Sequence, residues 1–285
     1  MSNPYSNRTL HSLSNTKTRD MSNPNNRMFE EFLRFVDKIA PTWFVFENVY
    51  GLTKFKNGEE NIQNHIENRF RDIGYTVKSK ILYASDFGVP QRRNRLFIVG
   101  NRNGIDFEFP KEFDYSVSVD EAISDLPVLG NGEIQMKGEY TVPFEQASPY
   151  AQLMRKKSKA PTQNIVSRNK DYVVERYKYI GQGENWSSIP DRLMENYADK
   201  KRCHSGIYKR LIGGKPSVVI SNYRKSMLIH PHQDRGLSVR EAARLQSFPD
   251  HFIFEGPVSY VQQQIGNAVP PLLAKAVMKK ILTYK

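Results

Sequence analysis

The order of hydrophobic patterns in the first third of the chain constrains the fold more than any other feature. Residues 27–40 place apolar side chains at three- and four-residue spacing, which predicts an amphipathic helix that ends before Pro41. A second helix and three strands rich in β-branched and aromatic residues are also predicted, at 59–73 and at 43–49, 76–84 and 95–100. Helix, strand, helix, strand and strand in this order predict part of an open α/β sheet.

The first predicted strand carries the most distinctive polar residues. In "TWFVFENVYG", residues 42–51, apolar side chains follow one another without polar alternation, which is typical of a strand covered on both faces of a parallel sheet. The strand ends on Glu47 and Asn48, and ligands of open α/β folds bind at the carboxyl edge of the strands. Glu47 is therefore a candidate functional carboxylate. A helix cap or an ion-pair partner is the commoner role for a carboxylate in this position.

Beyond residue 104 the periodic pattern is lost. Pro, Gly and Tyr are scattered among charged residues, with strand-like pieces such as 216–221, which predicts an irregular, mostly-β domain. Periodicity returns at 238–248, where Ser238 and Glu241 have capping-box spacing, and 272–282 predicts a final helix. We therefore expect a flexible N-terminal segment, a partial α/β domain, a separate irregular domain and a return to the α/β domain, at 1–26, 27–104, 105–235 and 236–285.

The charge of the chain points to a polyanionic partner. The 285 residues include 42 Lys and Arg against 30 Asp and Glu, a net charge of +12. Residues 151–225 alone hold 17 Lys and Arg against 6 Asp and Glu, so one segment carries nearly all of the excess. This distribution favours nucleic acid over a membrane surface. Each single cluster, such as "RKKSK" at 155–159, is also compatible with a solvated surface.

Several function classes are disfavoured by the composition. Cys203 is the only cysteine, so the chain cannot form a disulfide framework or a cysteine-based zinc site, and a cytoplasmic location fits. No run approaches the roughly 18 apolar residues of a membrane helix. We expect no metal at His204, His230 and His232, because His-Pro is typical of a turn and no further ligand is apparent.

Four segments, taken together and in order, resemble the C5-cytosine DNA methyltransferases. They are "FVFENVYGL" (44–52), "ASDFGVPQRRNRLFIVG" (84–100), "LSVREAARLQSFPDHFIFEG" (237–256) and "QQQIGNAVPPLLAKAV" (262–277). The resemblance leaves about 105–180 unmatched, where that family has its target-recognition domain. It implies the C-terminal half of a Rossmann-like methyltransferase sheet, a separate recognition domain, double-stranded DNA as substrate, and a bacterial or phage-encoded restriction-modification system.

The resemblance also implies a reaction on a cytosine that is rotated out of the duplex. A cysteine thiolate adds to C6, C5 takes a methyl group from S-adenosylmethionine, and elimination restores the ring. By match to the family motif Glu47 is the acid near N3, and burial beneath DNA would raise its pKa toward neutrality. Arg93 and Arg95 match arginines near the flipped base and its phosphates, with Arg95 expected at cytosine O2. Asn48 and Gln91 are supporting residues.

Cofactor and DNA contacts follow from the same resemblance. "QIGNAVPP" (264–271) is similar to a motif beside the methyl donor, with a tight turn at Gly266. The implied cofactor-binding residues are Gly266, Asn267, Ala268 and Val269. Arg240 and Glu241 match a motif that is mainly structural. The basic residues expected to contact DNA are Arg92, Arg155, Lys156, Lys157, Lys209, Arg210, Arg224 and Lys225.

Two parts of the family pattern are not recognised before Glu47, the Pro-Cys loop and the glycine-rich loop for the methyl donor. Cys203 lies far downstream, and we interpret it as a bystander. We therefore expect a complementary N-terminal methyltransferase subunit to share S-adenosylmethionine and supply the nucleophile, and the chain alone to be inactive. The alternative is an interrupted-gene remnant that acts as a catalytically dead DNA-binding module or regulator. Action on RNA stays open, because the base chemistry is the same.

Overall fold

The chain forms two units, and each unit is built from separate segments that alternate along the sequence. The computed structural model describes residues 28–54, 56–57, 60–195, 205–221, 223 and 227–284. The segment predicted to be flexible at 1–26 and the single cysteine, Cys203, lie outside these residues. Unit 1 comprises the described residues of 1–83, 94–111 and 279–285, and unit 2 comprises those of 84–93 and 112–278.

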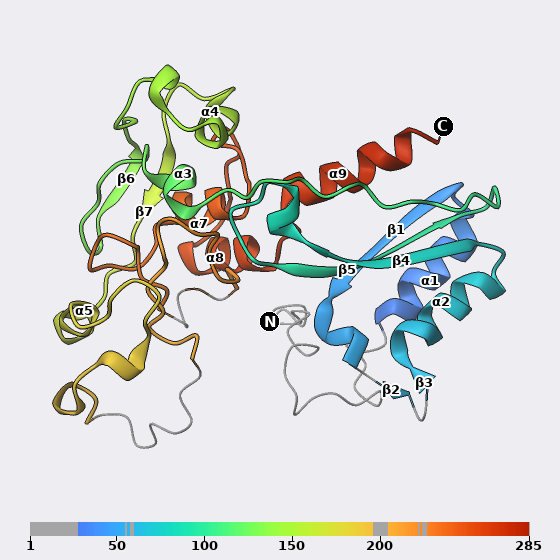
Figure 1. The fold of residues 1–285 in the computed structure, drawn as a ribbon, viewed down its shortest axis with the longest axis horizontal. Coiled ribbons are helices and arrows are strands. Elements are labelled where there is room, and N and C mark those ends of the chain that lie inside the picture. Colours follow the sequence, from blue (N-terminus) through green and yellow to red (C-terminus); the bar gives the residue numbers. More distant parts are fainter. Residues whose placement is uncertain are drawn as a thin grey trace, which may run out of the picture. The chain divides into compact units, whose positions relative to one another are not determined.

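The main sheet of unit 1 has three strands in the order β1-β5-β4 (Figure 1). They are β1 (Trp43–Val49), β4 (Thr76–Tyr83) and β5 (Asn94–Asn101), which confirms the three predicted strands. Both pairs are antiparallel, so the prediction of a parallel sheet is wrong for these strands. Only ten residues, 84–93, connect β4 to β5, and a parallel pair requires a crossover of about a dozen or more.

The two predicted helices of unit 1 are confirmed as α1 (Met28–Ile39) and α2 (Ile62–Asp72). A 3₁₀ turn and a short hairpin connect β1 with α2, at Tyr50–Lys54, β2 (Lys56–Asn57) and β3 (Glu60–Asn61). The Oδ1 atom of Asn61 accepts a hydrogen bond from the Gln63 backbone N–H at 2.8 Å. This cap explains why the helix begins later than the pattern predicts.

Both helices pack on one face of the sheet, and that packing fixes the direction of Glu47. The shared core consists largely of Phe29, Leu33, Val36, Phe44, Phe46, Ile62, Ile66, Phe70, Leu96 and Ile98. Phe44 and Phe46 of β1 therefore point toward the helices. Because successive strand residues point to opposite faces, Glu47 points to the other face of the sheet, as does Trp43, which packs on Phe107 and Tyr284.

Unit 2 is built from short helices and a two-stranded antiparallel sheet of β6 (Ile134–Lys137) and β7 (Thr162–Ile165). Its helices include α3 (Val119–Ile123), α4 (Pro149–Arg155), α5 (Asp171–Tyr177), α7 (Val239–Leu245) and α8 (Val258–Asn267). The prediction of a mostly-β domain at 105–235 is therefore wrong for the described residues. Local capping favours helices here, since Ser118 and Glu121 form a capping box and Ser148 caps α4.

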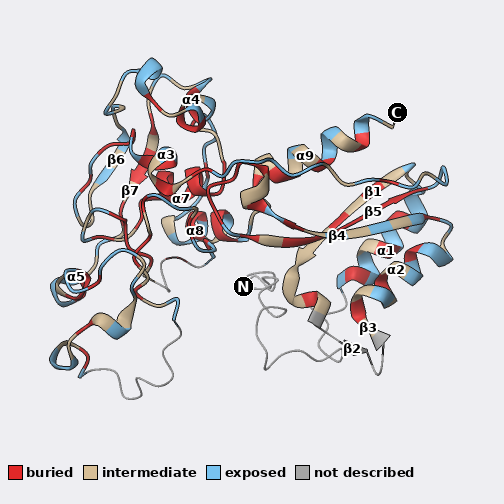
Figure 2. Ribbon diagram, viewed as in Figure 1, coloured by how far each residue is buried: buried red, intermediate tan, exposed pale blue. Residues whose placement is uncertain are grey.

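The core of unit 2 joins segments that are far apart in the sequence. Val119 and Ala122 of α3 share one core with Val239 and Ala242 of α7, and α7 is buried along its length (Figure 2). The predicted return of 236–285 to the α/β domain thus differs from the structure, in which α7 and α8 pack within unit 2.

Three smaller predictions have clear outcomes. The capping box of Ser238 and Glu241 is present at the start of α7, and the last helix is confirmed as α9 (Pro271–Leu282). The predicted strand at 216–221 is absent, because Ser217 forms only an isolated bridge with Gln91. Among the described residues, no helix is long and apolar enough to cross a bilayer.

Candidate active site

Glu47 and Arg95 lie on neighbouring strands and form an ion pair. In the antiparallel register Glu47 is opposite Phe97 and Val49 is opposite Arg95, so the two charged side chains are diagonal neighbours on one face. The Arg95 Nε atom is 2.7 Å from Glu47 Oε1, and the two side chains are 11% and 25% exposed. Glu47 lies two residues before the end of β1 rather than at its tip.

This ion pair bears directly on the predicted chemistry of Glu47. A guanidinium at 2.7 Å stabilises the charged carboxylate, whereas the sequence analysis expects a neutral proton donor. Burial lowers the pKa of Arg95, and the charge and hydrogen bond of Glu47 oppose that decrease. In this structure Glu47 therefore takes the ion-pair role that the sequence analysis names as the commoner alternative, and a quarter of its side chain stays accessible.

The neighbouring Asn48 acts locally. Its Oδ1 atom accepts a hydrogen bond from the backbone N–H of Val49 at 2.8 Å. The supporting role predicted for Asn48 stays a prediction. The end of β1 is thus held by a local hydrogen bond between a side chain and the adjacent backbone N–H.

Arg93, two residues before Arg95, has a different environment from the one predicted. It belongs to unit 2 and is 2% exposed. Its Nη1 and Nη2 atoms donate to the carbonyl oxygens of Ile220 and Gly266 at 2.9 and 2.8 Å. A guanidinium enclosed in this way cannot contact a phosphate or a base, so the predicted role of Arg93 beside the flipped cytosine disagrees with the structure.

Gln91 is a second buried brace in the same segment. Its Nε2 atom donates to Leu245 O and to Gln246 Oε1, and its Oε1 atom accepts from Ile220 N at 2.9 Å. Gln91 and Arg93 both hold the chain at Ile220. The supporting role predicted for Gln91 stays a prediction.

The four residues predicted to bind the cofactor lie at the end of α8. Gly266 is helical rather than part of a tight turn. Glycine is required there because an added Cβ atom would lie 2.1 Å from the Ser221 carbonyl oxygen. The Ala268 backbone N–H donates to Gln264 O at 3.1 Å. Asn267 is exposed and Val269 half-buried, whereas Gly266 is buried.

The predicted DNA-binding residues divide into accessible and enclosed ones. Arg92, Lys156 and Lys157 are exposed, whereas Arg155 and Arg210 are buried, and Lys209 is half-buried with its ammonium bound to Gly183 O. Arg210 donates to carbonyl oxygens of Tyr177, Ile180, His230 and Gln233 and to the Asp234 carboxylate. The prediction is therefore wrong for Arg155 and Arg210 in this structure. Arg224 and Lys225 lie outside the described residues.

Sequence reasoning missed two buried ion-pair clusters around α7. Arg244 pairs with Asp125 at 3.0 Å and with Asp250 at 2.5 Å, and Arg235 donates to both oxygens of Glu241 at 2.9 and 2.7 Å. Burial alone would raise the pKa of Glu241, but the charge and hydrogen bonds of Arg235 outweigh it and lower the pKa to about 2. The capping-box spacing and the match to a mainly structural motif mark Glu241 in the sequence, but neither signal identifies Arg235 as its partner.

Of the three histidines considered in the sequence, His230 and His232 are described by the structure, and His204 lies outside the described residues. Burial lowers the pKa of His230 to about 4, and its Nδ1 atom accepts a hydrogen bond from the His232 backbone N–H at 3.1 Å. His232 contacts Asp120 at 2.8 Å. Within the described ranges no group of three or more His, Cys, Asp or Glu side chains could hold a metal ion.

Comparisons with known proteins agree on one family. Residues 12–283 match the family model described as C-5 cytosine-specific DNA methylase. The chain is 34% identical to the type II methyltransferase M.DdeI of Desulfomicrobium norvegicum, over 93% of this chain and 69% of that protein. It is 35% identical to the type II methyltransferase M1.HphI of Haemophilus parahaemolyticus, over 91% of this chain and 61% of that protein.

The fold is similar to that of a solved structure. A protein titled as a DNA modification methyltransferase of an Escherichia coli prophage aligns with a TM-score of 0.66 at 23% identity, over 92% of this chain and 74% of that one. This likeness shows a mixed α/β methyltransferase fold. The family itself is shown by the match to the family model and by the identity to the relatives above. The chain therefore belongs to the C-5 cytosine-specific DNA methylase family.

Proposed function

We propose that this chain supplies the base-binding residues and the DNA-recognition unit of a DNA cytosine-5 methyltransferase. The observation that carries the proposal is the pair of Glu47 and Arg95, held together on one face of the sheet by the register of β1 and β5. The family match and the similarity to type II methyltransferases support DNA as the substrate.

In this proposal an extruded cytosine lies against Glu47 and Arg95. Addition of a thiolate to C6 places negative charge on the ring, which a proton donor at N3 and a fixed cation at O2 stabilise. Arg95 is suited to O2 because a guanidinium stays charged and offers paired donors. When the base enters, Arg95 donates to the cytosine as well as to Glu47, which weakens the ion pair. The base also removes water from the accessible quarter of the Glu47 side chain, and both changes favour the protonated carboxyl group.

The methyl group comes from S-adenosylmethionine, the donor that the family reaction uses. In this chain Asn267, Ala268 and Val269 would hold it, with Asn267 offering the exposed polar side chain. Arg93 fixes the end of α8 from behind through the Gly266 carbonyl oxygen and makes no contact with the donor.

Unit 2 is the recognition unit in this proposal. The exposed Arg92, Lys156 and Lys157 supply contacts to the sugar–phosphate backbone of double-stranded DNA. The buried Arg155 and Arg210 instead hold the loops of the unit in place.

The nucleophilic cysteine and the donor loop come from a stretch outside these 285 residues. The chain spans 61% and 69% of two relatives, which leaves length for such a stretch in proteins of this family. β1 is an edge of the described sheet, and no other described strand pairs with its outer side. A further polypeptide segment, either separate or covalently joined, could pair there.

The test is transfer of a labelled methyl group to duplex DNA. The chain is mixed with a polypeptide that carries a Pro-Cys loop and a glycine-rich donor loop, and each component is also assayed alone. We expect transfer only by the mixture, and a rate reduced by roughly 10² or more in Glu47→Gln, because glutamine keeps the shape but cannot give up a proton.

Glu67→Gln is the matched control. Glu67 is also in unit 1 and also ion-paired, with Arg71 at 2.7 Å, so this variant loses the same charge without touching β1. Full rate in Glu47→Gln would remove Glu47 from the mechanism. DNA binding without transfer by the mixture would favour the alternative, a DNA-binding module without catalysis.

A further inference from the structure

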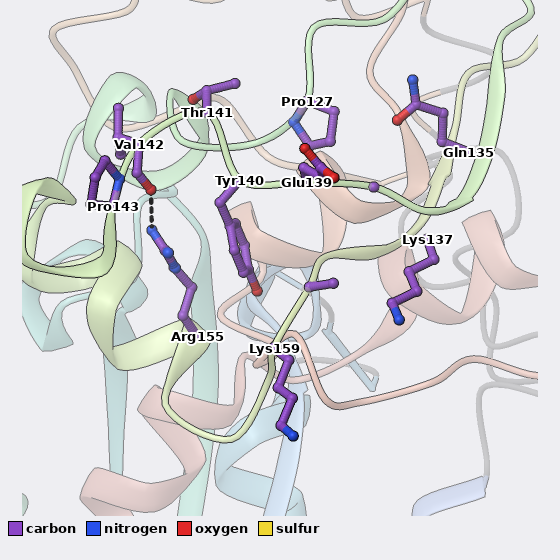
Figure 3. A pocket seen from close by; sticks show the side chains of 12 residues that line it. Pro127, Gln135, Lys137, Glu139, Tyr140, Thr141, Val142, Pro143, Arg155 and Lys159 are labelled. Carbon is purple, nitrogen blue, oxygen red and sulfur yellow. Dashed lines mark hydrogen bonds between the residues drawn. The ribbon is translucent and has the colours of Figure 1, made fainter.

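Unit 2 contains an open pocket of about 950 Å³ that none of the motifs identified in the sequence predicts (Figure 3). It lies between the end of β6, the chain at 138–143 and the loop that follows α4. Lys137, Tyr140, Arg155 and Lys159 line it, together with Glu139. We call it the β6–α4 pocket.

One wall of the β6–α4 pocket is rigid. The guanidinium of Arg155 lies 3.8 Å from the centre of the Tyr140 ring, and its Nη1 atom donates to Val142 O at 3.1 Å. The Tyr140 hydroxyl donates to Asp250 at 2.6 Å. A ligand therefore meets a surface that is already ordered, which limits the conformational cost of binding.

Arg155 is enclosed behind this wall. It is 7% exposed, and its Nε atom is buried without a hydrogen-bond partner among the described residues. Asp125 lies 3.5 Å from its Nη1 atom, so Arg155 shapes the wall and leaves the contacts with a ligand to the accessible side chains at the rim.

The charges at the rim point to an anion. Lys137 and Lys159 are exposed, and within the described part of the chain neither has an ion-pair partner. Glu139 is the acidic side chain among the lining residues. The accessible charged side chains that line the pocket are thus two cations, Lys137 and Lys159, and one anion, Glu139, whereas the charge of Arg155 is buried beside Asp125.

We propose that the β6–α4 pocket binds the sugar–phosphate backbone of duplex DNA. The inference rests on the proposed DNA substrate and adds a backbone contact at Lys137 and Lys159, two residues outside the predicted DNA-binding set. The pocket is far larger than a single ion needs, and flexible lysines suit phosphates as point charges rather than as readers of bases. The contact positions the recognition unit without reading sequence.

The experiment measures binding of the full chain to two duplexes of equal length and unrelated sequence over a range of salt concentrations. In Lys137→Gln/Lys159→Gln we expect weaker binding to both duplexes. The slope of log K against log salt should fall by about 2 in magnitude, because each lost phosphate contact removes about 0.9. Glu139→Gln should tighten binding to both duplexes, since it removes the repulsive carboxylate.

The control is Lys170→Gln/Lys178→Gln, which removes the same charge from unit 2 outside the pocket. Lys178 already pairs with Glu175 at 2.7 Å, and Lys170 is exposed at the start of α5. An equal loss in this control would overturn the pocket, because the effect would then be one of net charge. Loss on only one duplex would also overturn it, because it would indicate base readout.

The outcomes separate this inference from the proposed function. If the wild type binds DNA and Lys137→Gln/Lys159→Gln binds it equally well, the pocket is rejected as a DNA contact. DNA then remains the proposed substrate. Failure of the wild-type chain to bind either duplex at low salt rejects both. Thermal melting of each variant shows that the fold is intact, and all five substituted side chains are exposed.

Discussion

Replacing Gly266 by alanine tests whether the end of α8 is shaped by packing within unit 2. The added Cβ atom would lie 2.1 Å from the carbonyl oxygen of Ser221 and 2.7 Å from its carbonyl carbon. Ordinary contacts begin near 3.4 Å, so backbone would have to move by more than an ångström. The neighbouring Ile220 resists that movement because it bonds to Arg93 and Gln91.

The magnitude follows from these contacts. Overpacking costs typically 1–3 kcal/mol, and loss of one of the two hydrogen bonds at Ile220 adds roughly 1–3 kcal/mol because the partner groups are buried. We therefore expect Gly266→Ala to lower the free energy of unfolding by roughly 3 kcal/mol. The assay is urea denaturation of the chain without DNA or methyl donor.

Gly214→Ala is the control for this substitution. Nothing lies within 4 Å of a Cβ atom at Gly214, so the change should alter stability by less than about 1 kcal/mol. If Gly266→Ala unfolds at the same urea concentration as the wild type, the close approach of Ser221 is not a constraint, and the reasoning is refuted. A glycine that served only a bound cofactor would give that result.

Two further predictions concern the buried charges around α7. Lowering the pH from about 6.5 toward 4 should cost roughly 3 kcal/mol of stability, because the unfolded chain protonates His230 first while its folded pKa is about 4. Glu241 adds a similar loss of stability between about pH 4.5 and pH 2, because its pKa is about 2 in the folded chain and higher in the unfolded chain. Denaturation of His230→Gln at several pH values should lack only the loss between about pH 6.5 and 4. A pH profile equal to that of the wild type would contradict the assignment to His230. Arg244→Met should lower stability by about 3–5 kcal/mol in urea denaturation, because Asp125 and Asp250 would stay buried without their cation, and a loss below about 1 kcal/mol would contradict that role.

Local patterns predict the elements of unit 1 but not their pairing. The apolar spacing at 27–40 and the β-branched runs are local, and α1, β1, β4 and β5 form where they occur. The antiparallel direction of β5 could have been inferred from the ten-residue connection before it. The ion pair of Glu47 with Arg95 could not have been inferred, because these residues are 48 positions apart in the sequence and meet only through the register of β1 and β5.

Burial separates side chains that the sequence makes look equivalent. Arg93 and Arg95 lie in one motif and have little exposed surface, yet their partners differ. Arg93 binds carbonyl groups of Ile220 and Gly266 more than 120 residues away, whereas Arg95 pairs with Glu47 on the sheet. Arg155 and Lys156 are neighbours in one basic run, but Arg155 is buried against the aromatic ring of Tyr140 and Lys156 is exposed. A charge count predicts the sign of the surface but not which cations form it.

The interleaving of the two units limits how such a protein can be divided or recombined. The chain passes between them four times, after Tyr83, Arg93, Lys111 and Met278. No single cleavage therefore releases one unit whole, and an exchange of the larger unit between relatives has to carry 84–93 along with 112–278. A chimaera that left this short piece behind would pair a foreign Arg93 with the carbonyl groups of another protein's interior.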